Sequence, residues 1–348
     1  MKFGKISSPY SFGQTLQWVY YYFFPSTTNR SDIALMPIQS GEIHPANLNI
    51  SFVGDLMCLS DEKVVEPHPQ MISLFECADL IIINLEAPVV RDKIQKNKSL
   101  LVFGLSNEFI ERFLKLYQIQ KEKLIFTIAN NHIGDFNKEG YDETRKRLQD
   151  LGIKFVGDQS DTENVLTIQV KNHRVGFFAF SQWLNRLEFE KADAICRAKH
   201  IEKVDFHKIK KDKQLDLMII LPHWGFEFRH FPCKDTVQMA KTLIEKGADI
   251  IAASHPHVLG PIEKIHHGLC HYSLGNFFSK TLHYATNLTG IWSVSYDRSN
   301  REGDPFAYQL HPFYMTSQNK FELIDRLPVK LMGKLLKRLS LIYPESDR

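Results

Sequence analysis

Five apolar segments of this 348-residue chain each end in polar residues that are able to bind a metal ion. The apolar segments have the length and the aliphatic content of buried β-strands. The residues at their ends are Asp55, Glu86, Asn131 with His132, His223, and His255 with His257. In open α/β sheets, binding sites form in the crevice beyond the carboxyl ends of the strands. A fold that gathers these five strand ends would therefore bring the polar residues together without long loops.

The segments between these strands have helical spacing, so strands and helices alternate from residue 48 onward. The five strands are predicted at 48–53, 79–83, 124–128, 215–221 and 249–253. Helices are predicted at 62–77, 107–118, 138–151 and 234–246, and further strands at 165–170, 175–180, 260–265, 269–273, 290–296 and 305–313. Ser106 is a suitable N-cap for the second helix, and Gly152 is a suitable stop for the third. This alternation predicts an α/β protein.

The chain divides into three parts. Residues 1–45 are predicted to form an N-terminal extension, because they are turn-rich and lack periodicity. Residues 46–315 are predicted to form one domain, and residues 316–348 a helical tail. In the tail, a basic amphipathic helix at 329–342 carries Leu331, Leu335, Leu336 and Leu339 on one side. We expect this helix to pack on the body of the protein, with a partner surface as the alternative.

The N-terminal extension contains a very aromatic stretch at 15–25. It lacks the features of a signal peptide, and Pro25 ends it before it reaches the roughly 20 apolar residues of a transmembrane helix. One interpretation is a short element that packs on the domain. The other is an interfacial anchor, because tyrosine and tryptophan suit the membrane boundary. We therefore expect a cytoplasmic or peripheral membrane location.

The charge of the chain argues against a nucleic-acid partner, and its cysteines argue against a cysteine-based scaffold. The net charge is +3, and no concentrated basic run dominates the chain, so no nucleic-acid partner is predicted. The five cysteines are odd in number and include no CxxC pair, which argues against a disulfide framework and against a cysteine-based zinc ribbon. Cys58 is interpreted as a small buried hydrophobic residue.

The strand-end residues suit a metal centre. Manganese, zinc and iron accept imidazole nitrogen and carboxylate oxygen, and a carboxylate is able to bridge two such ions. Pro256 restricts the backbone between His255 and His257, which helps to hold both imidazoles. Taken singly, a histidine after a strand is more often a hydrogen-bonded structural residue than a ligand, and in the same way Asp55 could cap a helix and Asn131 could belong to a turn. The joint pattern favours a site for one or two divalent ions.

Six motifs in order resemble those of the CapA/PgsA proteins, which act in poly-γ-glutamate capsule biosynthesis. The resemblance covers about residues 48–280. The motifs are Gly54-Asp55-Leu56-Met57, Asn84-Leu85-Glu86-Ala87-Pro88, Ala129-Asn130-Asn131-His132 with Asp135 and Gly140, His223-Trp224-Gly225-Phe226-Glu227, Ser254-His255-Pro256-His257-Val258 with Pro261-Ile262-Glu263, and Tyr272-Ser273-Leu274-Gly275-Asn276-Phe277.

That family in turn resembles the calcineurin-like metallophosphoesterases, which implies a two-sheet β-sandwich flanked by helices with a dinuclear site. The resemblance implies that Asp55 and His257 bind the first metal and that Glu86 bridges. It implies that Asn131, His223 and His255 bind the second metal, and that His132 is the leaving-group acid. The residues that would orient the ligands are Asn84, Glu227, Glu263 and Asn276. Met57 is a departure, because ordinary phosphoesterases have a histidine at that position.

Three functions are compatible with these features. The first is a metal-dependent hydrolase that acts on a phosphoester or related bond of an anionic small molecule or polymer. The second is a non-catalytic factor for assembly or export of an anionic surface polymer, working with other capsule-synthesis proteins. The third is a structural domain without metal. The family resemblance favours the first two.

Overall fold

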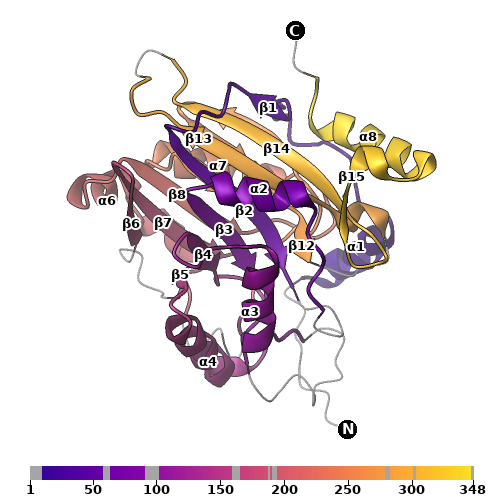
Figure 1. Ribbon diagram of the computed structural model, residues 1–348, viewed down its shortest axis with the longest axis horizontal. Helices are drawn as coiled ribbons and strands as arrows, with labels where there is room; N and C mark the ends of the chain where they lie inside the picture. The colour runs from indigo at the N-terminus through magenta and orange to yellow at the C-terminus, as the bar shows by residue number, and fades with distance from the viewer. Residues whose placement is uncertain are drawn as a thin grey trace.

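The computed structural model describes residues 10–57, 63–90, 102–158, 165–186, 189, 194–278, 283–300 and 303–345. Within these ranges the strands form a nine-stranded and a six-stranded sheet with helices on the outside (Figure 1). The predicted two-sheet α/β architecture is therefore confirmed. Cys58 and the first residue of the helix predicted at 62–77 lie outside the described residues.

The first sheet has the order β1-β14-β13-β2-β3-β4-β5, with β12 beside β2 and β15 beside β14. The strands are β1 (Gln39–Ser40), β2 (Leu48–Leu56), β3 (Leu80–Leu85), β4 (Leu124–Thr127), β5 (Lys154–Val156), β12 (Asn276–Phe278), β13 (Leu288–Tyr296), β14 (Phe306–Met315) and β15 (Phe321–Leu323). β2, β3, β4 and β5 are parallel to one another. Their carboxyl ends therefore lie along one edge of the sheet.

The second sheet has the order β10-β11-β9-β8-β7-β6. Its strands are β6 (Leu166–Val170), β7 (His173–Ser181), β8 (Leu217–His223), β9 (Ile250–Ala252), β10 (Ile262–Ile265) and β11 (Gly268–His271). β7, β8, β9 and β11 are parallel. This sheet therefore has a shared carboxyl edge of its own.

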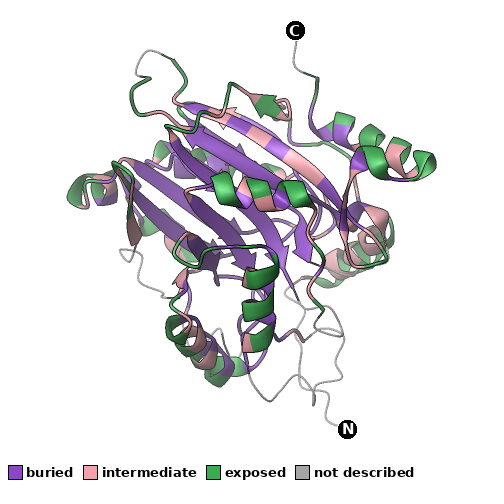
Figure 2. Cartoon of the chain, viewed as in Figure 1, coloured by how far each residue is buried: buried purple, intermediate pink, exposed green. Residues whose placement is uncertain are grey.

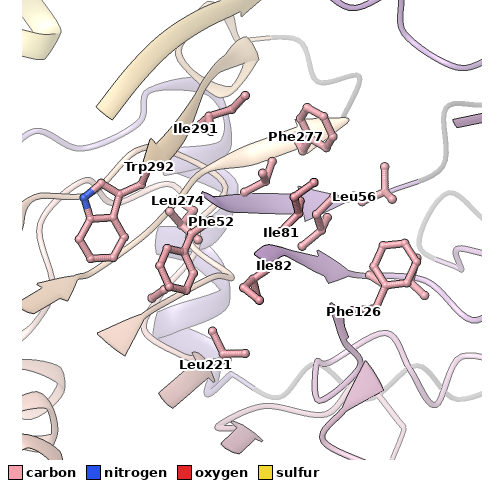
Figure 3. Close-up of a cluster of buried hydrophobic side chains, with 14 of the residues drawn as sticks. Phe52, Leu56, Ile81, Ile82, Phe126, Leu221, Leu274, Phe277, Ile291 and Trp292 are labelled. Atoms are coloured by element: carbon pink, nitrogen blue, oxygen red, sulfur yellow. The ribbon is translucent and has the colours of Figure 1, made fainter. Parts of the chain in front are cut away.

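The core forms because both faces of these strands are apolar, as expected for parallel strands covered on two sides. Successive residues of β8 belong to different clusters: Leu217, Ile219 and Leu221 join the larger core, whereas Met218 and Ile220 join a second one. This alternation reflects the two-residue period of a strand. Figure 3 shows Leu221 near Phe52 and Ile82 of the first sheet. The larger core thus fills the space between the sheets.

The outer faces of the two sheets are covered by different helices. They are α2 (Pro69–Cys77), α3 (Asn107–Leu116) and α4 (Asn137–Asp150), together with α6 (Phe206–Asp212) and α7 (Lys234–Glu245). Phe75 of α2 and Phe113 of α3 contact Phe277 beside the first sheet. Phe206 of α6 contacts Phe178 of the second. The central strands, such as β2, β3 and β8, are buried, whereas the helices keep an exposed outer side (Figure 2).

The helix predicted at 62–77 begins later in the structure than the sequence indicates. α2 begins at Pro69 rather than near residue 62, with His68 as its N-cap, because Glu66 pairs with the chain at Lys320 and Pro69 favours a helix start. Ser106 caps α3 as predicted, accepting a hydrogen bond from the Phe109 N–H at 3.1 Å.

The helix predicted at 329–342 is α8 (Val329–Ile342). Leu335, Leu339 and Ile342 are buried, so this helix packs on the body as expected. Leu336 is 49% exposed, and its predicted place on the packed side is therefore wrong. Adjacent positions of a helix point about 100° apart, so Leu335 and Leu336 do not share one narrow contact.

The aromatic N-terminal stretch forms α1 (Phe12–Phe23), which Ser11 caps through a capping box. Its inner side lies on the domain, where the Trp18 and Phe228 rings are 5.9 Å apart. Its outer side is exposed, with Phe12 82% accessible. Among the described residues, no helix combines the length and the apolar character needed to cross a bilayer.

Candidate metal centre

The candidate ligands lie where the carboxyl edges of the two sheets meet. Asp55 is in β2 and is the register partner of Asn84 in β3. His223 ends β8 and forms a bridge with Ser254. All six candidate ligands and His132 are less than a tenth exposed. The ends of the five strands therefore lie close together in the structure, as predicted.

Gly54 allows one of these strands to approach its neighbour. A Cβ at this position would lie 1.9 Å from the carbonyl oxygen of Gly275. The Asp55 N–H donates to the same oxygen at 3.0 Å. Asp55 is thus held against the segment that leads into Asn276, and any larger residue at position 54 would push the two apart.

Three potential ligand atoms surround Nε2 of His223. Asn131 Oδ1 lies at 2.8 Å, His255 Nδ1 at 3.1 Å and Glu86 Oε1 at 3.4 Å. Ligands bound about 2.1 Å from one ion are separated from each other by about 3.0–3.4 Å. The distances to His255 and Glu86 are within this range and the distance to Asn131 is slightly shorter, so the contacts of His223 are close to the spacing of a shared coordination shell.

Glu86 supplies the most direct indication of a cation. Its side chain is fully buried, yet neither carboxylate oxygen has a hydrogen-bond partner. Burial, followed by the charge of Asp55, raises the pKa of Glu86 well above its ordinary value. A buried carboxyl without hydrogen-bond partners is costly unless a cation compensates it. The residues present thus fit a divalent ion next to Glu86.

A second group consists of Asp55, Glu86 and His257, which could also hold an ion. His257 Nδ1 lies 3.1 Å from Asp55 Oδ2. Burial alone would lower the pKa of His257, but the charge of Glu86 and the hydrogen bond with Asp55 outweigh it and raise the pKa to about 10. Burial opposes the ionisation of Asp55, but the hydrogen bond and charge of His257 lower its pKa overall.

The other two histidines are neutral. Burial lowers the pKa of His223 to about 3. Burial and the neighbouring His223 lower the pKa of His255 well below its ordinary value. A neutral imidazole is the form that binds a metal. His223 and His255 are therefore already in the protonation state that a ligand requires.

The backbone at His255 and His257 is strained. Their φ angles are 99° and 58°, in a region that residues with a Cβ rarely adopt. Such strain persists only where the surrounding structure enforces it, and it is concentrated at functional sites. The strain is consistent with a segment that is shaped to present both imidazoles.

His132 lies beside this cluster in a network of its own. Its Nδ1 is 2.8 Å from Asp135 Oδ2, and Asn185 Nδ2 is 3.3 Å from its Nε2. The Asp135 carboxylate accepts the Nδ1 proton, which leaves Nε2 as the ring nitrogen for a second partner. Asn185 also accepts a hydrogen bond from Asn131 Nδ2 at 3.4 Å. His132 is thereby oriented next to a candidate ligand.

Four residues are expected to orient the ligands, and three of these four lie next to a candidate ligand. Asn84 donates to Asp55 Oδ1 at 2.8 Å, and Asn276 Oδ1 lies 2.9 Å from His257 Nδ1. Glu227 Oε2 lies 3.9 Å from His257 Nε2. Glu263 instead accepts a hydrogen bond from the Tyr272 hydroxyl at 2.6 Å, and its expected role stays a prediction.

With this geometry in place, comparison with known families gives a clear result. The family described as bacterial capsule synthesis protein PGA_cap matches residues 49–281, about two thirds of the chain. The chain belongs to this family. All six candidate ligands and His132 lie within the matched residues. The predicted resemblance to capsule biosynthesis proteins is confirmed.

Two curated members of the family are similar in sequence. A capsule biosynthesis protein CapA of Bacillus anthracis is 28% identical over 167 residues, which cover 44% of this chain and 39% of the relative. The PGA biosynthesis protein CapA of Bacillus subtilis strain 168 is 26% identical over 242 residues, which cover 66% of this chain and 63% of the relative. The match thus spans less than two thirds of either relative.

Solved structures to which the chain is similar include a putative 5′-nucleotidase and a calcineurin-like phosphoesterase. A putative 5′-nucleotidase of Staphylococcus aureus has a TM-score of 0.49 and 14% identity, covering 83% of this chain and 58% of its own. The calcineurin-like phosphoesterase YfkN of Bacillus subtilis has a TM-score of 0.45 and 11% identity, covering 84% of this chain and 97% of its own.

Four residues at the site carry no predicted role. Asp135 and Asn185 flank His132, and Asp135 could have been identified from its position three residues later in the same family motif. Tyr10 and Trp18 come from the N-terminal extension, outside the region matched by the family. Tyr10 Oη is 2.9 Å from His255 Nε2, and Trp18 Nε1 donates to Glu227 Oε2 at 2.7 Å. No local pattern marks these two residues.

Proposed function

We propose that this chain is a metal-dependent hydrolase of a phosphoester-type bond, acting in the biosynthesis of poly-γ-glutamate or another anionic surface polymer. The observation that carries the proposal is the fully buried Glu86 carboxyl, which has no hydrogen-bond partner and lies 3.4 Å from His223 Nε2. Either one or two ions of manganese, zinc or iron are compatible with these ligands.

The metal centre would be held by two overlapping sets of side chains. Glu86, Asn131, His223 and His255 would form one set, and Asp55, Glu86 and His257 the other. A bound divalent ion supplies a Lewis acid and a water of lowered pKa. Glu86 belongs to both sets, which suits a bridging carboxylate.

His132 would act as the acid for the leaving group. Its Nδ1 is held by Asp135, so its Nε2 is the atom that would carry and release a proton. The ring lies against Phe103, with 4.3 Å between the ring centroids. Asp135 and Phe103 together would keep the imidazole in one orientation during proton transfer.

The test begins with purified protein, whose metal content is measured before activity is assayed. Turnover of an aryl phosphate with added manganese or zinc supports the proposal if His132→Ala loses at least about a hundredfold in kcat. His266→Ala is the matched control, because His266 has a largely exposed side chain. A folded, metal-loaded protein without activity on a broad panel of phosphoesters would count against hydrolysis.

A second candidate function is a non-catalytic factor for assembly or export of the same polymer. Met57 favours it, because a thioether stands where ordinary phosphoesterases have a nitrogen ligand. Complementation of a capsule-deficient strain separates the two: the assembly function predicts that His132→Ala restores capsule, and the hydrolase function predicts that it does not. The expression level of each variant should be measured alongside the capsule assay.

The partners we propose follow from this function. They are an anionic small molecule or polymer as substrate, with other capsule-synthesis proteins nearby. Contact with a membrane surface would use the exposed outer side of α1, where Phe12 and Leu16 are more than half exposed. Flotation with anionic vesicles tests this contact, and a Phe12→Ser, Leu16→Ser double variant that floats equally well would contradict it.

A further inference from the structure

We propose that Tyr10 and Trp18, from the N-terminal extension, are positioning residues that complete the metal centre by orienting His255 and Glu227. The inference rests on the proposed metal site. It extends that site beyond residues 49–281, the region that the family match covers. It also gives α1 a role other than packing.

The hydroxyl of Tyr10 lies between two residues of the centre. Its oxygen is 2.9 Å from His255 Nε2 and 3.5 Å from Glu227 Oε1. A phenol has one proton to donate, and an ionised carboxylate only accepts. Tyr10 donates its proton to Glu227, so its oxygen accepts the proton on His255 Nε2. This arrangement fixes His255 as the Nε2–H tautomer.

The tautomer determines which nitrogen of His255 is free for a cation. With the proton on Nε2, the lone pair is on Nδ1, which lies 3.1 Å from His223 Nε2. That is the side of the ring that faces the candidate ligand cluster. Ligating histidines generally donate their other ring N–H to a nearby acceptor, and that partner orients the ring. Tyr10 takes this place for His255.

Trp18 acts on the other partner of Tyr10. Its indole Nε1, which is able only to donate, lies 2.7 Å from Glu227 Oε2. Glu227 Oε2 is also 3.9 Å from His257 Nε2. The indole therefore fixes the carboxylate that faces Tyr10 on one side and His257 on the other.

The N-terminal segment is attached firmly enough to deliver these groups. The Tyr10 ring packs edge-on against Trp183, with 5.1 Å between centroids, and lies 5.9 Å from Phe226. After α1, the Ser26 N–H donates to the Phe228 carbonyl at 2.8 Å, and the His230 N–H donates back to Ser26 at 3.0 Å. Contacts at both ends of α1 thus hold it on the segment that follows β8.

The test compares single-group deletions in the full chain. Tyr10→Phe removes only the hydroxyl, and Trp18→Phe removes the indole N–H. Tyr20→Phe is the matched control, because Tyr20 is on the same helix as Trp18 and is 60% exposed. The readouts are metal affinity, by competition with a chelator, and the visible absorption spectrum of the Co²⁺-loaded protein, which reports on ligand geometry.

We expect Tyr10→Phe to weaken metal binding roughly tenfold to a hundredfold and to change the Co²⁺ spectrum. We expect a smaller loss for Trp18→Phe and none for Tyr20→Phe, with the thermal midpoints of the metal-free proteins alike. Equal affinity and equal spectra for Tyr10→Phe and Tyr20→Phe would overturn the inference alone. A wild-type protein that binds no metal would overturn the proposed function, and this inference with it.

Discussion

His132 and Asp135 form a buried pair in which Nδ1 of the imidazole lies 2.8 Å from Oδ2 of the carboxylate. The same carboxylate oxygen accepts the Phe103 N–H at 2.9 Å. A carboxylate that is fixed by the backbone in this way holds the imidazole in one tautomer and orientation. The arrangement makes His132 suited to proton transfer from Nε2.

Weakening this pair should slow catalysis without affecting the fold. In Asp135→Asn the amide no longer requires a proton on Nδ1 of His132, so the ring is no longer held in the orientation that leaves Nε2 to carry and release the proton. We expect kcat on an aryl phosphate to fall roughly tenfold to a hundredfold with KM little changed. Asp142→Asn is the control, because it alters only an exposed ion pair between Asp142 and Lys138 on α4. A loss of equal size in both variants would contradict the role of Asp135.

Metal binding should release protons and strengthen as the pH rises. His257, whose pKa is raised to about 10, holds a proton at neutral pH and must lose it to become a ligand. Each displaced proton makes the affinity rise by about tenfold per pH unit below that pKa. Calorimetry between pH 6 and pH 8, in buffers of different ionisation enthalpy, measures both effects. An affinity that does not change over this range would exclude His257 as a ligand.

Glu86→Gln should separate metal binding from stability. The substitution keeps the shape of the side chain and removes a buried carboxyl whose oxygens have no hydrogen-bond partner, so the metal-free protein should be within about 1 kcal/mol of wild type. The rise in thermal midpoint on adding metal should disappear, because a bound ligand stabilises only the state that it binds. A Glu86→Gln protein that metal stabilises as much as wild type would contradict the assignment.

Much of the site was predictable because it depends on strand ends. Asp55, Glu86 and His223 each follow an apolar run, and parallel strands bring their carboxyl ends together whatever loops connect them. The short strand β12 was not predicted, since three residues carry no periodicity and its place beside β2 depends on the close approach of Gly54 to Gly275.

Other parts of the site depend on tertiary contacts that leave no local trace. Tyr10 and Trp18 lie more than 200 residues from their partners His255 and Glu227. Their aromatic context is compatible with a packed helix and with an interfacial anchor. Only the placement of α1 on the segment after β8 shows what its inner side contacts.

Acid should destabilise the protein through a histidine outside the metal centre. Burial lowers the pKa of His271 to about 3, where its Nε2 lies 3.1 Å from the Gly260 carbonyl oxygen. Because the folded pKa lies below the unfolded value of about 6.5, this stability is complete above pH 6.5 and is lost as the pH falls from there toward 3. The loss is about 1.4 kcal/mol per pH unit within that window.

Urea unfolding at pH 7.5 and pH 5.0 measures this effect. His271→Gln keeps a donor for Gly260 and removes the titration, so its stability should change less between the two pH values than that of wild type. His266→Gln, at a largely exposed side chain, should behave as wild type does. An unchanged pH dependence in His271→Gln would show that other groups govern the acid response.

Crystals grown with Mn²⁺ and measured for anomalous scattering test the central claim most directly. The account predicts a peak within bonding distance of Glu86, Asn131, His223 and His255. The potential ligand atoms of Glu86, Asn131 and His255 already lie 2.8–3.4 Å from His223 Nε2. It would be contradicted by crystals in which these four side chains keep this arrangement and no anomalous peak lies among them.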